Sequence, residues 1–423
     1  MPSTTAAHAT GPATNPGRKE FVALVAGILM TIAFAIDSML PALPAIAHSL
    51  GVTIPNHQQF VITAFMVGFG ISQFFVGTLS DRYGRRGLML ASLVGYTIFS
   101  LAAAIAPTFE LLLLARFLQG TAAAGARVLI ISVVRDKFEG RAMAQVMSLA
   151  SVVFMAAPIL APTMGTLIIA VAPWRWIFLV LAMVGVILWT WVFRRLSESQ
   201  HPDDRRLITK AQIFESFGIV LSDRQSVGYT LAMTFMTCSI FGFITSVQQI
   251  FEQTFGHPQL LAGGFAIMAS TMAVASLVNS RIVMRWGMRP IGHYALTGFT
   301  IVAGVHVVVA ASGQETLVSF IVLQAVMMGF FALSVGNFGA LSMEHVGHVA
   351  GTASSLQGSI STIGGAVGGS VIGQMFNGTT TPLYAAITVS GIGALVAVYV
   401  AERGQMFTSR NDRVIEDDSW HIG

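Results

Sequence analysis

Long hydrophobic segments, separated by short polar ones, fill most of this chain. The hydrocarbon core of a bilayer is about 30 Å thick, and a helix needs about 20 apolar residues to cross it. Twelve segments of the sequence reach this length, at about 21–47, 58–79, 87–107, 109–133, 143–171, 174–195, 226–250, 260–284, 290–311, 316–341, 349–375 and 382–402. The pattern predicts an all-α membrane protein with twelve transmembrane helices in two six-helix bundles.

The composition supports a membrane protein. The 423 residues are 54% hydrophobic and only 10% charged, which leaves too few charges to keep a soluble protein of this size in solution. Cys238 is the single cysteine, so a disulfide framework and a cysteine-based metal site are both excluded. We expect no metal, no cofactor and no nucleic-acid partner, since the basic residues lie at the ends of the spans.

The basic residues are unevenly distributed between the predicted loops. With a cytoplasmic N-terminus, 20 of the 23 Lys and Arg residues fall on the cytoplasmic side, as the positive-inside rule requires. Both termini are therefore predicted to be cytoplasmic. The predicted parts are a disordered tail at 1–17, a six-helix bundle at 18–195, a linker at 196–225, a second six-helix bundle at 226–403 and a tail at 404–423.

The two halves of the sequence resemble each other. A shift of 203 residues places the loop after the second span on the loop after the eighth, with Gly84 on Gly287 and Arg86 on Arg289. Repeated halves are typical of transporters whose substrate site lies near the middle of the membrane. The acidic residue of the first loop has no counterpart, because Met284 occupies its position. We therefore expect the two loops to differ in their contacts.

Asp37 is the one acidic residue that lies deep within a hydrophobic span. Ionisable groups at membrane depth are costly and usually functional, so we predict that Asp37 carries a proton. Arg116, in the fourth span, lies at a similar depth when each residue rises 1.5 Å, and we expect the two charges to interact. The alternative is that Arg116 braces helices or extends outward past Glu110.

Further polar residues within the spans are candidates for a substrate cavity. Arg127 returns to nearly the same helix face as Arg116; it either contacts a polar substrate group or extends toward the cytoplasm. The uncharged candidates are Gln119, Gln248, Gln324, Asn337 and Gln357. Polar side chains at such depth also join helices to one another, so both interpretations stay open.

The fifth predicted span contains Pro158, Pro162 and Gly165. Proline removes a backbone hydrogen bond and small residues let helices approach closely, so a kinked gating helix is predicted. An ordinary packing kink is the alternative. The corresponding segment of the second half, in the eleventh span, is rich in glycine.

Several motifs resemble those of the major facilitator superfamily. Its loop signature is matched by Gly77-x-x-x-Asp81-Arg82-x-Gly84-Arg85-Arg86, and its buried-arginine motif by Leu112-x-x-x-Arg116-Phe-x-Gln119-Gly120. Its bicyclomycin-resistance group of drug:proton antiporters is resembled by Asp37-x-x-x-Pro41-x-x-Pro44, Arg135-Asp136, Trp174-Arg175-Trp176 and Gly351-Thr-Ala-Ser354. The similarity covers almost all of residues 21–402 and is densest in the first half.

The resemblance implies a multidrug efflux transporter in the inner membrane of a bacterium, driven by protons and acting as a monomer. Its partners would be small amphipathic compounds, protons and the lipid bilayer. The loop residues Gly77, Asp81, Arg82, Gly84, Arg85 and Arg86 would form a conformational latch. This latch would be strengthened on one side only, because Met284 stands where the second loop would carry its acid. A proton-coupled symporter that imports a metabolite is the alternative on the same fold. An enzyme is not expected, because the sequence shows neither a metal motif nor a nucleophile paired with a base.

Overall fold

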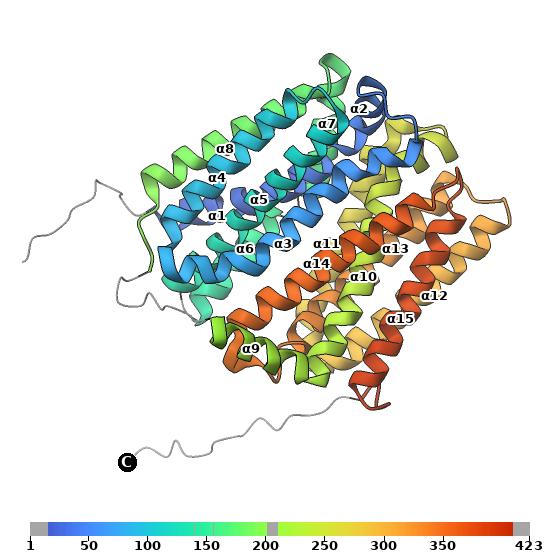
Figure 1. The fold of residues 1–423 in the computed structure, drawn as a ribbon. Coiled ribbons are helices and arrows are strands. Elements are labelled where there is room, and N and C mark those ends of the chain that lie inside the picture. The colour runs from blue at the N-terminus through green and yellow to red at the C-terminus, as the bar shows by residue number, and fades with distance from the viewer. Residues whose placement is uncertain (1–15, 139, 155, 201–209, 409–423) are drawn as a thin grey trace, which may run out of the picture. The chain divides into compact units, whose positions relative to one another are not determined.

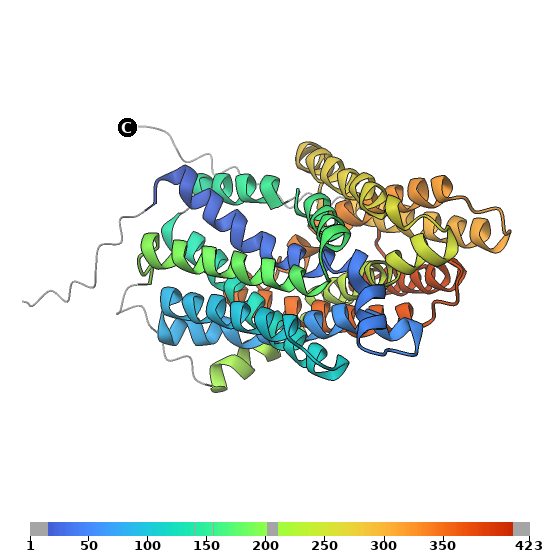
Figure 2. The same cartoon turned by 90° about the horizontal axis from the view of Figure 1, so that it is seen from above.

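The computed structural model describes residues 16–138, 140–154, 156–200 and 210–408, and within these ranges every regular element is a helix (Figure 1). The chain divides into two compact units, Met1–Ile213 and Phe214–Gly423. Within each unit the long helices run roughly along one another, as the two views in Figures 1 and 2 show. The predicted tails at 1–17 and 404–423 lie mostly outside the described residues.

The helices of unit 1 follow the predicted spans. They are α1 (Arg18–Asp37), the 3-10 turn η1 (Leu40–Ala42), α2 (Leu43–Ser49), η2 (Pro55–Gln59), α3 (Phe60–Tyr83), α4 (Arg85–Ala104), α5 (Phe109–Lys137), α6 (Gly140–Phe154), α7 (Ala157–Val171) and α8 (Arg175–Arg195). A further helix, α9 (Lys210–Ser222), contains the boundary between the units and lies within the predicted linker.

The helices of unit 2 follow a similar order, with a single helix α14 where unit 1 has α6 and α7. They are α10 (Arg224–Gln249), a π-helical turn η4 (Ile250–Thr254), η5 (Pro258–Leu260), α11 (Leu261–Trp286), α12 (Met288–Ala311), α13 (Leu317–Leu341), η6 (Gly347–Val349), α14 (Ala350–Gln374) and α15 (Thr381–Ala401).

Ten helices in the described part of the chain are long and apolar enough to cross a membrane. Two of the twelve predicted spans are not among them. The predicted fifth span is divided into α6 and α7, each 15 residues long, and Pro158 lies at the start of the second because proline suits the first turn of a helix. The predicted eleventh span is the 25-residue α14, in which glycine, serine and threonine dilute the apolar residues.

Pro41 determines where α1 ends. A proline ring clashes with the carbonyl of the residue four positions earlier and has no N–H to donate. For Pro41 that residue is Asp37, and α1 ends there. The chain continues as η1 and α2, so the spacing Asp37-x-x-x-Pro41 places the acidic side chain at a break in the helix.

The internal repeat is visible in the backbone of two glycines. Gly84 lies between α3 and α4 with φ 89° and ψ 162°, and Gly287 lies between α11 and α12 with φ 80° and ψ 160°. Side chains disfavour positive φ, so glycine is the suitable residue for both turns. These are the residues that the 203-residue shift aligns, so the repeat extends from sequence to local conformation.

Candidate functional site

Asp37 occupies the break in α1 and is buried, with 6% of its surface exposed. Within the described residues its carboxyl group has no hydrogen-bond or ion-pair partner. An isolated carboxylate is costly to bury, whereas the neutral acid is much less so. The arrangement therefore favours the protonated form of this side chain in the conformation described here.

Arg116 lies on α5 and is fully buried. It donates hydrogen bonds to the carbonyl oxygen of Val61 at 3.0 Å, to Gln119 Oε1 at 2.6 Å and to the carbonyl oxygen of Ala35 at 2.9 Å. Its guanidinium also faces the rings of Phe65 and Phe178, with centroids 4.6 and 5.8 Å away. The five donors of arginine suit such a multiple contact, and the side chain ties α5 to α1 and α3.

The expected ion pair between Asp37 and Arg116 is not formed in this structure: none of the ion pairs among the described residues joins them. Instead, Arg116 holds the backbone of α1 at Ala35, two residues before the acid. Sequence depth placed both groups at the right level. Depth in the sequence could not identify the acceptors of Arg116, because every residue has a backbone carbonyl whatever its side chain.

Close contacts between helices bring Arg116 to these carbonyls. A Cβ added at Gly120 would lie 2.0 Å from the carbonyl oxygen of Phe65, and one at Gly68 would lie 2.0 Å from that of Phe117. Only glycine permits this approach. The Gln119-Gly120 step of the sequence motif therefore sets the distance between α3 and α5.

The predicted gating helix meets the same break. A Cβ at Gly165, on α7, would lie 2.2 Å from the carbonyl oxygen of Ser38 and 2.9 Å from Pro41. Pro162 lies inside α7, one turn earlier. The break after Asp37 therefore lies between the Ala35 carbonyl that Arg116 binds and the Gly165 face of α7. Three features predicted from the sequence meet here: the buried acid, the buried arginine and the proline- and glycine-containing span.

The predicted cavity residues differ in their surroundings. Arg127 is exposed, with its guanidinium 5.8 Å from the ring centroid of Phe69. Gln119, Gln248, Gln324, Asn337 and Gln357 are buried. Four of them join helices or helix ends within their own unit, whereas Gln248 pairs with Glu252 one turn away.

The latch residues of unit 1 contact acids that the motif does not contain. Arg85 Nε lies 3.2 Å from Asp136 Oδ2 at the end of α5. The backbone N–H groups of Arg85 and Arg86 donate to the carboxylate of Glu198 at 2.9 and 3.2 Å, which caps the start of α4. The Asp81 side chain lies outside the described residues.

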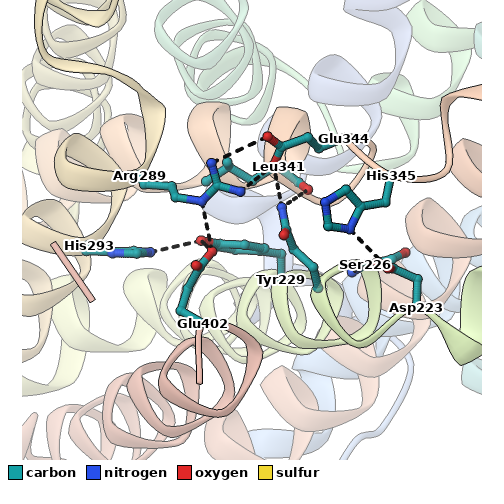
Figure 3. Close-up of polar contacts among 10 residues, drawn as sticks. Asp223, Ser226, Tyr229, Arg289, His293, Leu341, Glu344, His345 and Glu402 are labelled. Carbon is teal, nitrogen blue, oxygen red and sulfur yellow. Dashed lines mark hydrogen bonds and ion pairs between the residues drawn. The ribbon is translucent and has the colours of Figure 1, made fainter. Parts of the chain in front are cut away.

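Unit 2 has its own charged cluster, which the sequence analysis missed. Arg289 Nη2 lies 2.6 Å from Glu344 Oε2, and its Nε lies 3.0 Å from Glu402 Oε1 (Figure 3). Glu344 follows α13 and Glu402 follows α15, so the acids come from other helices than the loop. The loop of unit 2 therefore has acidic partners although Met284 replaces the acid of the motif, and the one-sided latch stays a prediction.

Two uncharged groups extend this cluster. Tyr229 donates from its hydroxyl to Glu402 Oε1 at 2.7 Å, and His293 Nε2 lies 2.9 Å from the same hydroxyl (Figure 3). Burial raises the pKa of the Glu402 carboxyl, but the hydrogen bonds from Tyr229 and Arg289 and the charge of Arg289 outweigh it. The net result is a pKa below the ordinary value.

Two related units of long apolar helices are typical of membrane transport proteins. The chain belongs to the Major Facilitator Superfamily, whose sequence profile matches residues 24–369. This confirms the family predicted from the motifs. Members of this family are transporters.

Known proteins resemble the chain over nearly its whole length. An uncharacterized MFS-type transporter, YdgK, of Bacillus subtilis is 30% identical over 91% of this chain and 96% of its own. A bicyclomycin resistance protein homolog of Haemophilus influenzae is 28% identical over 92% of this chain and 96% of its own length. The crystal structure of a D-xylose-proton symporter superposes with a TM-score of 0.71 at 15% identity, covering 90% of this chain and 96% of that one, which shows the fold alone.

Proposed function

We propose that this protein is a proton-coupled antiporter that exports small amphipathic compounds from the cytoplasm across the inner membrane of a bacterium by alternating access. The observation that carries the proposal is Asp37, a buried carboxyl without a partner among the described residues, at a break of α1. The bicyclomycin resistance homolog supports export of drug-like compounds. Two related units of helices support alternating access.

Asp37 is the proton carrier in this proposal. In the conformation described here the carboxyl holds its proton, because burying an unpaired carboxylate is unfavourable. Release then requires a second conformation, in which water, substrate or a displaced Arg116 stabilises the carboxylate. An inward proton supplies about 2.3 kcal/mol per 100 mV and about 1.4 kcal/mol per pH unit, enough for a substrate gradient of one or two orders of magnitude.

Arg116 positions the carrier. Its hydrogen bond to the Ala35 carbonyl fixes the last turn of α1, and Gly165 of α7 packs against the next residues. A movement of α5 or α7 therefore changes the surroundings of Asp37 directly. This contact supplies the physical link between a change of conformation and a change of protonation.

The test measures export by purified protein in liposomes, with a pH gradient imposed across the membrane. We expect Asp37→Asn to lose proton-driven export and to retain substrate exchange without a gradient, because the amide is a permanently neutral substitute. Glu110→Gln, at an exposed acid on α5, is the matched control and should transport normally. Undiminished proton-driven export by Asp37→Asn would refute the assignment.

The same liposomes separate export from import. An antiporter accumulates substrate on the acidic side of the membrane, whereas a symporter moves it to the side that the protons enter. If substrate accumulates on the side that the protons enter, the protein is a symporter and not the proposed antiporter. The role of Asp37 in proton coupling would be unaffected by that result.

A further inference from the structure

A second pair of ionisable groups is buried in unit 2, at the end of α12 opposite the Arg289 cluster. His306, on α12, is fully buried, and the Glu315 side chain is 7% exposed. His306 Nε2 lies 2.6 Å from Glu315 Oε1. The second carboxylate oxygen accepts a hydrogen bond from the hydroxyl of Thr380, the residue before α15. The carboxylate thus joins the α12–α13 loop to two helices.

The charge balance of this pair depends on one proton. With a neutral imidazole and an ionised Glu315 the buried pair carries one negative charge. One added proton makes it neutral overall. A net charge is unfavourable in a buried site, and an ion pair with good geometry offsets much of that cost. The pair is therefore suited to hold one proton.

His306 also has a free position for that proton. Its Nδ1 atom is buried and has no hydrogen-bond partner, so a proton can be added there without breaking an existing bond. His293, the buried histidine of the Arg289 cluster, differs. Its Nδ1 accepts the backbone N–H of Phe407 at 3.1 Å and its Nε2 bonds Tyr229, so protonation would break a bond.

An aromatic ring covers one face of the His306 imidazole. The ring of Tyr384 on α15 stacks on the imidazole with centroids 3.4 Å apart and an angle of 19°. The Tyr384 hydroxyl donates to Gln324 Oε1 at 2.9 Å, which fixes the ring. An aromatic face stabilises a positive charge placed over it. Within the described residues, α11 and α13 bring no charged group into contact with His306.

A proton can reach the pair through the α12–α13 loop. Glu315 is flanked by Gln314 and Thr316, which are exposed, so the carboxylate lies one layer beneath the surface. The predicted orientation places this loop on the outer side of the membrane, from which a proton-driven exporter takes its protons.

We propose that His306 and Glu315 form a second proton-binding site, located in unit 2 and accessible from the α12–α13 loop. The site binds one proton on His306, with Glu315 as the counter-ion and Tyr384 as the aromatic support. Its proton binding is independent of the proposed export; its effect on transport rests on that function.

The first experiment measures the protons that the purified protein takes up between pH 8 and pH 5 in detergent. We expect His306→Gln to take up about one proton fewer than the unaltered protein. His293→Gln is the matched control and should take up the same number, because His293 stays neutral. Equal uptake by the unaltered protein and a folded His306→Gln would overturn the proposal.

A second variant keeps the proposal testable if His306→Gln does not fold. Glu315→Gln leaves the histidine in place but removes its counter-ion, so the buried imidazole should stay neutral and uptake should again fall by about one proton. Unchanged uptake in folded Glu315→Gln would overturn the role of the carboxylate and with it the paired site.

The transport experiment varies the outer pH at a fixed membrane potential. We expect His306→Gln to keep active export through Asp37 and to lose part of the stimulation by outer acid. If the unaltered protein exports nothing, the proposed function fails, and the titration still decides the proton site. If the titration shows no difference, the site fails and the Asp37 mechanism is unaffected.

Discussion

Arg116 and Asp37 are both buried in unit 1, yet their surroundings differ. The guanidinium has three hydrogen bonds and two aromatic faces, whereas the carboxyl has no partner among the described residues. Arginine can remain charged in such a site because carbonyl dipoles and ring faces replace water. A carboxyl without donors has no such support, so this conformation favours the neutral acid.

The contacts of Arg116 make a prediction for Arg116→Lys. An ammonium group cannot reach the two carbonyls and Gln119 at once, and each buried acceptor left unpaired costs about 1–3 kcal/mol. We expect a clearly lower thermal unfolding midpoint together with weaker proton-driven export. Arg194→Lys, at an exposed arginine of α8, is the control and should be stable. An unchanged midpoint in Arg116→Lys would show that the three bonds do not stabilise the fold.

Arg127 offers a test of substrate recognition at the same scale. Its side chain is exposed and lies over the ring of Phe69, so no buried contact requires it for folding. If it contacts substrate, Arg127→Ala and Arg127→Lys should change the relative transport of anionic and cationic compounds without lowering stability. Normal selectivity in both variants would show that Arg127 takes no part in substrate recognition.

Helices approach most closely where glycine replaces a side chain. Gly165 of α7 lies against the backbone that follows Asp37, and the glycines of α14 lie against α10, where a Cβ at Gly369 would be 2.5 Å from Phe241. The two contacts correspond in the internal repeat. Close packing, rather than a loose hinge, is therefore what these predicted gating segments show within each unit.

Gly165→Ala tests that contact. The added methyl group would overlap the Ser38 carbonyl, and overpacking of this kind costs about 1–3 kcal/mol. We expect lower stability and slower transport, because α7 must move away from the break in α1. Gly304→Ala on α12 is the control, since a Cβ there meets nothing within 4 Å. Equal transport rates for the two variants would contradict a tight α1–α7 contact.

At the scale of the whole molecule, the two units share a plan but not their chemistry. In each unit, an acid that follows a late helix binds the start of the third long helix. In unit 1, Glu198 after α8 accepts the backbone N–H of Arg85 at the start of α4. In unit 2, Glu402 after α15 pairs with the side chain of Arg289 at the start of α12. The 203-residue shift places Ile240 where Asp37 lies. The partner-free acid at a helix break therefore belongs to unit 1.

The charged cluster of unit 2 predicts how stability depends on pH. The folded state holds the pKa of Glu402 below the ordinary 4.5, so its contribution to stability is complete above about pH 4.5 and is lost as the pH falls through the folded value. Thermal unfolding followed from pH 6 to pH 3.5 should show this loss. Glu402→Gln should be less stable at pH 6 and less sensitive to acid; an unchanged pH dependence would contradict it.

Much of this structure could be predicted from the sequence. Hydrophobic segment length indicated the helices, the depth of Asp37 in its span indicated a buried acid, and the repeat aligned the loop glycines Gly84 and Gly287. The partners of charged groups could not be predicted. Glu198 and Glu402 lie more than 100 residues along the chain from the arginines they contact. The acceptors of Arg116 include backbone carbonyls, which leave no signal in the sequence.

The break in α1 has an electrostatic consequence of its own. The peptide dipoles of a helix add up to a partial negative charge at its C-terminal end, worth about 0.3–1 kcal/mol to a nearby charge and up to about 2 kcal/mol where water is scarce. Asp37 is the last residue of α1, so this end of the helix repels a carboxylate at that position. Because Pro41 stops the helix there, it places the acid at this negative end, which favours the protonated form over the carboxylate.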